Sequence, residues 1–285
     1  MNLTDINEIN ALLHRHDFRF SKSMGQNFLV ESWVPRQIAE EALISEEDGV
    51  LEVGPGIGCL TVQLAERAAQ VSCLELDESL QPLLSETLAG CENVTVTFAD
   101  ALKTDLAAHC REVLGERPWR VCANLPYNVA TPLITEFLRC GIFQSITVMI
   151  QKEVAGRICA KAGDKDYGAF SVLTQWYAAV EELFDVPPSC FLPQPKVTST
   201  VIRLVPRSTP PADVADEDFF FRTVRGAFLQ RRKTLSNSLR SAFSGFSREA
   251  IVEAIAECGL PETVRGEALT IPQFAALSNA LYKRK

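Results

Sequence analysis

Short apolar runs alternate with amphipathic stretches over the first 161 residues, and this alternation is the strongest constraint on the fold. Apolar runs of this length are typical of β-strands that are covered on both faces; they lie at 50–53, 71–76, 94–98, 120–123 and 146–150. The stretches between them are typical of helices, including 60–68, 80–88, 131–139 and 152–161. The pattern therefore predicts an α/β fold with a parallel sheet between two layers of helices.

The pattern changes in the last third of the chain. Residues 180–186 and 198–205 are expected to form an antiparallel pair of strands that closes one edge of the sheet. A segment rich in proline and polar residues follows at 206–218 and has the composition of a linker. Beyond it the pattern is helical, with expected helix starts at Asp216, Ser247 and Pro272. We therefore expect two domains: an α/β domain over 1–207 with a helical N-terminal extension over 1–30, and a smaller all-α domain over 208–285.

Composition excludes several classes of protein. With 47% apolar and 22% charged residues, the chain is neither a disordered chain nor a coiled coil. No apolar run approaches the ~18 residues that a membrane span requires. The first ten residues lack the basic start and apolar run of a signal peptide, so a cytoplasmic protein without a membrane partner is expected. Nine cysteines without a CxxC pair and three scattered histidines predict reduced thiols and no metal centre.

A glycine-rich turn follows the first strand of the alternating region. Gly54, Gly56 and Gly58 stand between that strand and the next helix, where glycine lets the backbone turn tightly and lets a ligand approach it. Glu75 ends the second strand, where a carboxylate can accept hydrogen bonds from ribose hydroxyls. The alternative is a tight turn with an unrelated acid downstream. Together these features favour a nucleoside-type cofactor.

Two acidic residues bear on which cofactor this is. Glu52 lies inside the turn motif, where its charge would repel a pyrophosphate but suit the charged methionine end of S-adenosylmethionine. Asp100 follows the third strand and is placed to accept a hydrogen bond from an adenine amino group. Both residues favour S-adenosylmethionine, as a methyl donor, over NAD.

The sequence Asn124-Leu125-Pro126-Tyr127 follows the fourth strand and therefore falls at the ligand-binding edge of the sheet. The amine of adenine is a poor nucleophile because its lone pair is delocalised into the ring. The Asn124 side-chain oxygen and the Leu125 carbonyl could accept its two N–H bonds and so favour a tetrahedral nitrogen. Pro126 would stiffen the turn, and Tyr127 could stack on a base flipped out of its helix. The alternative is an ordinary proline turn.

Basic residues gather in one segment of an acidic chain. The net charge is −8, yet residues 219–241 contain six basic residues and no acidic one. Such a segment is expected to contact RNA phosphates, although a solvated helix face is the alternative. The expected phosphate contacts are Arg222, Arg225, Arg231, Arg232 and Lys233. Arg19 and Lys22 could contact RNA or only be exposed, and Phe219–Phe221 are expected in the core.

Nearly the whole chain resembles the ribosomal RNA adenine N6-dimethyltransferases, in particular the bacterial type that acts on 16S rRNA. The similarity rests on many motifs in a fixed order. These are GQNFL (25–29), the glycine turn, LELD (74–77), AD (99–100), NLPYN (124–128), QKEVAGR (151–157), YGAFSVLTQ (167–175), FLPQPKVTSTVIRL (191–204) and AFLQRRKTLSNSL (227–239).

The resemblance implies a Rossmann-like class I S-adenosylmethionine-dependent methyltransferase domain with a smaller helical C-terminal domain that recognises the subunit. It implies dimethylation of two adjacent adenosines in the 3′-terminal hairpin loop of 16S rRNA, within the small (30S) subunit or its precursor. Phe191 would stack on the target base opposite Tyr127, beside the catalytic residues 124–127. The implied cofactor residues are Asn27, Leu29, Gly54, Gly56, Glu75, Asp100, Ala101 and Asn124. Nothing in the sequence calls for an oligomer, so a monomer is expected.

Three alternatives stay open at this point. The macrolide-resistance methyltransferases share the fold and chemistry but target 23S rRNA, and the helical tail and the 191–204 segment favour the small-subunit type. A non-catalytic assembly or transcription factor could keep the fold, but the intact 124–127 motif and Glu75 argue against it. A nicotinamide-dependent oxidoreductase has a similar glycine turn but no use for the 124–127 motif.

Overall fold

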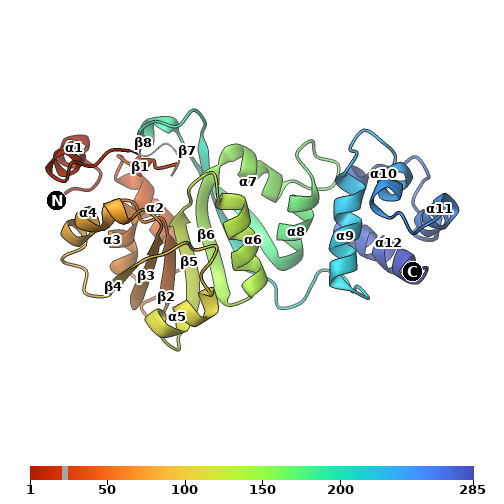
Figure 1. Cartoon of the computed structure of the whole chain (residues 1–285), viewed down its shortest axis with the longest axis horizontal. Helices are drawn as coiled ribbons and strands as arrows, with labels where there is room; N and C mark the ends of the chain where they lie inside the picture. Colours follow the sequence, from red (N-terminus) through yellow and green to blue (C-terminus); the bar gives the residue numbers. More distant parts are fainter. Residues whose placement is uncertain (21–24) are drawn as a thin grey trace. The chain divides into compact units, whose positions relative to one another are not determined.

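The computed structural model describes residues 1–20 and 25–285, so Lys22 lies outside the described residues. Its contacts divide the chain into two compact units (Figure 1). The first consists of Met1–Ala155 together with Ala179–Pro206, and the second of Gly156–Ala178 together with Arg207–Lys285. None of the described helices is long and apolar enough to cross a membrane.

A seven-stranded sheet with the order β4-β3-β2-β5-β6-β9-β7 forms the centre of the first unit. The pairs from β4 to β6 are parallel, and β9 pairs antiparallel with β6. These strands confirm the predicted parallel sheet and place the two late strands at one edge. Their bounds are Gly49–Val53 (β2), Gln70–Glu75 (β3), Val94–Phe98 (β4), Trp119–Asn124 (β5), Phe143–Gln151 (β6), Ala178–Val186 (β7) and Ser199–Pro206 (β9).

Helices pack on both faces of the sheet, as the near-continuous apolar strands predict. Successive side chains of a strand point to opposite faces. On β3, Cys73 belongs to the buried cluster with α2 and α3, whereas the neighbouring Ser72 hydroxyl is hydrogen-bonded to His109 of α5 at 2.8 Å. Figure 1 shows α6 on the same side as α5. The bounds are Trp33–Glu41 (α2), Cys59–Ala65 (α3), Leu106–Leu114 (α5) and Ala130–Cys140 (α6).

The N-terminal segment packs against the same unit. Helix α1 (Ile6–Arg15) begins at Asp5, whose carboxylate caps the backbone N–H groups of Asn7 and Glu8, and shares a buried cluster with α4 (Gln81–Thr87). Strand β1 (Phe28–Leu29) then pairs antiparallel with β8 (Phe191–Leu192). Residues far apart in the sequence therefore meet beside the sheet.

The second unit is helical and contains its own buried core. Phe219–Phe221 lie in that core with exposed fractions of at most 5%, as expected, together with Trp176. The predicted helix starts at Asp216 and Ser247 are N-caps, and the third helix starts one residue before the predicted Pro272. The bounds are Ala169–Tyr177 (α8), Glu217–Phe228 (α9), Leu235–Ala242 (α10), Arg248–Glu257 (α11) and Ile271–Tyr282 (α12).

Residues 156–178 belong to the helical unit, whereas the sequence assigns them to the α/β domain. They include the end of α7 (Lys152–Cys159) and all of α8. The reason is packing: Tyr167, Val172 and Trp176 are buried with residues of α9 and α12, and the Tyr167 hydroxyl donates to the Leu269 carbonyl at 3.0 Å. Sequence order alone does not reveal such long-range contacts.

Candidate functional site

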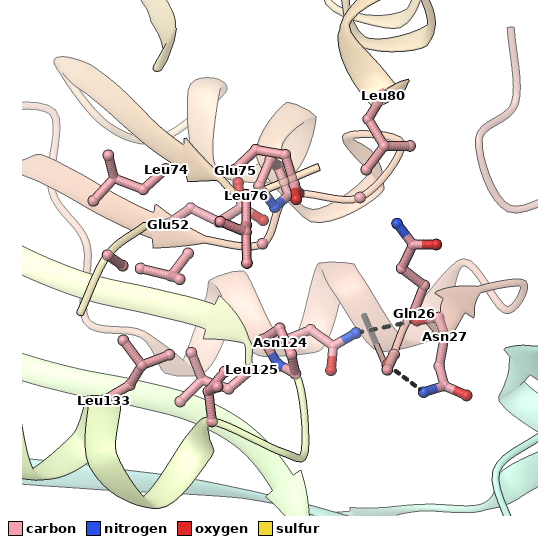
Figure 2. A pocket seen from close by; sticks show the side chains of 18 of the residues that line it. Gln26, Asn27, Glu52, Leu74, Glu75, Leu76, Leu80, Asn124, Leu125 and Leu133 are labelled. Carbon is pink, nitrogen blue, oxygen red and sulfur yellow. Dashed lines mark hydrogen bonds between the residues drawn. The ribbon is translucent and has the colours of Figure 1, made fainter. Parts of the chain in front are cut away.

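A pocket opens at the carboxyl edge of the parallel strands in the first unit (Figure 2). Its walls come from the ends of β2, β3, β4 and β5, together with residues 25–29 of the N-terminal segment. This is the edge at which open α/β sheets bind ligands. Of the predicted site residues, those that line it are Asn27, Leu29, Gly54, Gly56, Glu75, Asp100, Ala101, Asn124, Leu125, Pro126 and Tyr127.

The glycine-rich turn packs directly against the 124–127 turn. Gly54 has a φ of +73°, and a Cβ on it would lie 3.3 Å from Cγ of Pro126. Gly56 has a φ of +60°, and a Cβ there would lie 3.2 Å from the ring of Phe28. Glycine is required at both positions for its backbone conformation and for these close approaches. The turn thereby brings two predicted motifs and the N-terminal segment into contact.

Two carboxylates stand at neighbouring strand ends. Glu75 is 7% exposed, and its Oε1 accepts a hydrogen bond from the backbone N–H of Asp77 at 2.9 Å. Burial raises the pKa of Glu75. Asp100 accepts from the backbone N–H of Leu102 at 3.0 Å and lies 3.2 Å from the Lys103 ammonium. Both carboxylates line the pocket and can accept hydrogen bonds from a polar ligand.

Two exposed apolar side chains lie next to these carboxylates, and the sequence assigns them no role. Leu76 is 56% exposed and Leu102 is 41% exposed, and both line the pocket. Exposing apolar side chains to water costs free energy. An apolar or aromatic part of a ligand that packs between them would remove this cost. Leu76 directly follows Glu75, and Leu102 comes two residues after Asp100. This closeness to the two acidic residues is the only sequence feature that points to these leucines.

A third carboxyl group lies deeper, at the base of the pocket. Glu52 of β2 is 1% exposed and accepts a hydrogen bond from the Thr61 hydroxyl at 2.6 Å. Burial raises the pKa of Glu52 to about 7, although the Thr61 and Cys73 hydrogen bonds favour its ionised form. Repulsion from the negative charge of Glu75 also raises the pKa of Glu52. A positively charged ligand group nearby would favour the ionised carboxylate.

The Asn124 side chain is oriented by the N-terminal segment. Its Nδ2 donates to the backbone carbonyl of Asn27 at 3.4 Å, which directs the side-chain oxygen away from that segment (Figure 2). The next residue, Leu125, is fixed by a hydrogen bond from its N–H to the Met149 carbonyl on β6 at 3.1 Å. The turn therefore holds the two proposed acceptors on a rigid backbone, at the edge of the pocket.

Tyr127 is anchored at its hydroxyl group. This hydroxyl is hydrogen-bonded to the buried Ser199 hydroxyl of β9 at 2.7 Å. Burial raises the pKa of Tyr127, so the phenol stays neutral near pH 7. Tyr127 lines the pocket, and the hydrogen bond to Ser199 holds the hydroxyl end of its side chain in place.

The N-terminal segment is tied to three elements around the pocket. Gln26 donates from Nε2 to the Asp77 carboxylate after β3 at 2.7 Å. The Asn27 carbonyl accepts from Asn124, and its own side chain donates to the Gly25 carbonyl at 2.8 Å. Leu29 lies opposite Phe191 in the β1–β8 pair. Gln26 also lines the pocket; the sequence contains it in the GQNFL motif (25–29) but gives no signal of its contact with Asp77.

Phe191 does not line the pocket with the other predicted residues. Its side chain is 2% exposed and belongs to the same buried cluster as Leu29 and Val34. Strand β8, which contains Phe191, pairs with β1, and the Phe191 ring is buried in the core. In this arrangement the Phe191 ring packs with the N-terminal segment rather than in the pocket, which differs from the expected stacking position opposite Tyr127.

The predicted phosphate contacts all lie in the second unit and are exposed. Arg222 and Arg225 belong to α9, whereas Arg231, Arg232 and Lys233 lie in the turn between α9 and α10 rather than on a helix face. The Arg222 guanidinium lies 4.5 Å from the centroid of the Phe243 ring. Among the described residues, no group of three His, Cys, Asp or Glu could hold a metal ion, and the nine cysteines are free thiols.

Sequence comparisons place these residues in a known context. The model of the ribosomal RNA adenine dimethylase family matches residues 17–281. A ribosomal RNA small subunit methyltransferase A from Alkaliphilus oremlandii is 46% identical over 274 residues, which cover 96% of each chain. The protein of the same name from Bacillus mycoides is 44% identical and covers 98% of this chain and 97% of its own.

Solved structures are similar as well. A dimethyladenosine transferase from Plasmodium falciparum has a TM-score of 0.73 at 25% identity, covering 87% of this chain and 95% of its own. The 23S rRNA methyltransferase ErmE has a TM-score of 0.68 at 27% identity, covering 90% of this chain and 99% of its own. The fold is therefore that of methyltransferases which act on ribosomal RNA.

Proposed function

This chain belongs to the ribosomal RNA adenine dimethylase family and is an rRNA methyltransferase, and we propose that it dimethylates the N6 amine of two adjacent adenosines in 16S rRNA. The proposed target is the 3′-terminal hairpin loop, in the small (30S) subunit or its precursor. The support is twofold. The near full-length relatives are named for the small subunit, whereas the similar 23S enzyme is more distant in sequence. The proposed setting is the cytoplasm, with the protein acting as a monomer.

The pocket fits S-adenosylmethionine, the methyl donor that we propose. Glu75 offers an acceptor to ribose hydroxyls, and Asp100 offers one to an adenine amino group. Leu76 and Leu102 supply exposed apolar surface for the adenine ring. Glu52 supplies a carboxylate for the positively charged end of the ligand. When bound, the cofactor supplies an electrophilic methyl group.

The 124–127 turn then prepares the nucleophile. The Asn124 side-chain oxygen and the Leu125 carbonyl accept the two N–H bonds of the adenine amine. Acceptors in these positions stabilise a tetrahedral nitrogen whose lone pair is available for attack, which is preorganised electrostatic stabilisation. Tyr127 stacks on the flipped base. The proton leaves after methyl transfer, when the amine is cationic and acidic, so the turn needs no strong general base.

One observation carries this proposal: the hydrogen bond from Asn124 Nδ2 to the Asn27 carbonyl. It supports the proposed orientation, in which the amide nitrogen faces the N-terminal segment and the amide oxygen faces the substrate. An amide in the opposite orientation would present a donor to the adenine amine and repel it. The N-terminal segment thus contributes to catalysis through the orientation of one side chain.

A transfer assay with labelled S-adenosylmethionine tests the proposal. The substrates are small subunits from a strain that lacks the modification and, in parallel, protein-free 23S rRNA. We expect labelled N6,N6-dimethyladenosine from the subunits alone. Label on 23S rRNA alone would assign the chain to the resistance type. No label on either, with cofactor binding intact, would contradict the proposed activity.

A further inference from the structure

One edge of the central sheet lacks the features that protect an exposed strand. Strand β4 (Val94–Phe98) ends the sheet on one side, and β7 ends it on the other (Figure 1). Edge strands usually carry charges, proline or a bulge, which hinder the addition of another chain. On β7 the exposed charges are those of Glu181, Glu182 and Asp185, whereas β4 has the sequence VTVTF, without charge or proline. Of the two edges, β4 is therefore the one that can accept a further strand.

The backbone of β4 is also open along its outer side. At one end of the strand the Asn93 carbonyl accepts from β3, and at the other end the Ala99 N–H donates to β3, each at 2.8 Å. Alternate residues of an edge strand face its one neighbour, so the even-numbered residues between these two face outward. The N–H groups of Val96 and Phe98 accordingly donate to none of residues 1–20 and 25–285. They are free to pair with an added strand.

An apolar groove lies beside this edge, between β4 and α4. Its apolar lining comes from both elements: Leu84, Leu88, Val94, Val96 and Phe98. Successive side chains of a strand point to opposite faces of a sheet. A strand that pairs with β4 would therefore place every second side chain on the face that carries the groove. The fitting segment is one with apolar side chains at alternate positions.

Two exposed acids without ion-pair partners flank the groove. Glu92 precedes β4 by two residues, and Glu78 precedes Gln81, a lining residue of the groove, by three. Within the part of the chain that the structure describes, neither carboxylate forms an ion pair. Their charge would repel RNA phosphates, and a second copy of this chain would bring the same acids and a net charge of −8. The complementary occupant is a basic polypeptide.

We propose that β4 binds an extended, basic segment of a small-subunit ribosomal protein by strand addition. In this mode the backbone groups of Val96 and Phe98 pair with the segment, and its alternate apolar side chains enter the groove. Lysine or arginine next to those apolar residues contacts Glu78 and Glu92. This inference rests on the proposed function, because the subunit that carries the target RNA is the source of the partner.

A synthetic peptide tests the mode of binding on the full-length protein. In this probe, threonine alternates with valine and leucine between two pairs of lysines, and fluorescence anisotropy reports its binding. We expect saturable binding, and glutamate in place of the lysines should weaken it about tenfold. Methylation of every second backbone nitrogen should weaken binding about tenfold in one of the two alternate sets, because only one set faces β4. No saturable binding, or equal effects of the two sets, would overturn strand addition.

Variants at exposed positions locate the peptide on the protein. Ser85 lines the groove from α4, so Ser85→Trp should fill it and weaken binding about tenfold or more, whereas Ser85→Ala should bind as the wild type does. Glu92→Lys should weaken binding roughly three- to tenfold. Glu112→Lys, at an exposed acid of α5, changes the net charge equally but should alter affinity less than about twofold. Equal affinities of the two Ser85 variants would overturn the proposed groove.

Photo-crosslinking on unmodified small subunits tests the source of the segment. Ser85→p-azidophenylalanine should crosslink to a basic stretch of one ribosomal protein, identified by mass spectrometry. A crosslink only to rRNA, or none while the variant methylates the subunits, would overturn this inference and leave the proposed function supported. A wild-type protein that binds subunits but does not methylate them would instead overturn the proposed function.

Discussion

At the scale of single residues, the predicted chemistry depends on the position of side chains at strand ends. Gly54, Glu75, Asp100 and Asn124 could be predicted because each stands within a motif that ends a recognisable strand. The contact between Gln26 and Asp77 could not, because the two residues are 51 positions apart in the sequence. Phe191 was assigned from a family resemblance, and the β1–β8 pairing that buries it leaves no local sequence signal.

The role of Asn124 as an acceptor predicts a specific kinetic change. Asn124→Ala should lower kcat by about 10²–10³-fold, because one preorganised hydrogen-bonding group is lost from the reaction. The dissociation constant of S-adenosylmethionine, measured by calorimetry, should change less than tenfold. As a control, Asn124→Asp keeps a hydrogen-bond acceptor but cannot donate to the Asn27 carbonyl. Its kcat should therefore fall between those of the wild type and Asn124→Ala. Near-normal turnover of the alanine variant would exclude the acceptor role.

Glu75 should contribute to binding rather than to the chemical step. Glu75→Ala removes a buried acceptor for ribose hydroxyls and should weaken cofactor affinity by about 10- to 100-fold. At saturating cofactor, kcat should stay within a few-fold of the wild type. Calorimetry measures the first quantity and a single-turnover assay the second. An unchanged affinity would refute the ribose assignment.

Glu52 predicts a pH dependence of cofactor affinity. Its pKa is raised to about 7, so its carboxyl group is mostly protonated below that pH and negatively charged above it. A cationic ligand favours the charged form, so affinity should rise roughly three- to tenfold as pH increases from about 6 to 8. The quantity to measure is the ratio of wild-type affinity to that of Glu52→Gln. A ratio that does not change with pH would show that Glu52 does not interact with the ligand charge.

At the scale of elements, the sequence predicts strands and helices well where apolar periodicity is clear. The strands β2, β3, β5 and β6 are predictable because each contains a run of buried, largely apolar residues, whereas β4 is only partly buried. The two-residue strands β1 and β8 are too short to leave a periodic pattern, yet they position residues 28 and 29 at the pocket. Their pairing is a tertiary contact.

The contact between the glycine turn and the 124–127 turn can be isolated with two alanine variants. Gly54 and Gly141 both have positive φ, but a Cβ on Gly141 would meet nothing within 4 Å. Alanine at either position should cost about 1–2 kcal/mol of stability. Only Gly54→Ala, which presses on Pro126, should also weaken cofactor binding by tenfold or more. Equal cofactor affinities in the two variants would show that this contact does not shape the pocket.

At the scale of the whole molecule, the two units are not two consecutive stretches of sequence. The linker composition at 206–218 marks the place where the chain passes into the C-terminal helices. The linker composition does not indicate that residues 156–178 belong with those helices. The side chains of this segment are buried in one cluster with Phe220 and Phe274, which come later in the chain. A single boundary near residue 207 therefore assigns residues 156–178 to the wrong unit.

This organisation predicts the behaviour of a truncated chain. A protein ending at residue 207 keeps α8 but loses the helices that bury Tyr167, Val172 and Trp176. Exposed apolar side chains of this size favour aggregation, so the fragment should aggregate or show a lower melting temperature than the full chain. Trp176→Ser in the fragment should improve its solubility but should destabilise the full chain. A fragment as soluble and stable as the intact protein would contradict the division into these units.

The central claim is that the 124–127 turn, oriented by the N-terminal segment, methylates adenosine in the small-subunit rRNA. The most direct test expresses this chain in a bacterium that lacks the modification and then maps the 16S rRNA by mass spectrometry. We predict two adjacent N6,N6-dimethyladenosines in the 3′-terminal hairpin loop with the wild-type chain, and none with Asn124→Ala at equal protein level. Unmodified 16S rRNA with the wild-type chain, or full modification with Asn124→Ala, would contradict the claim.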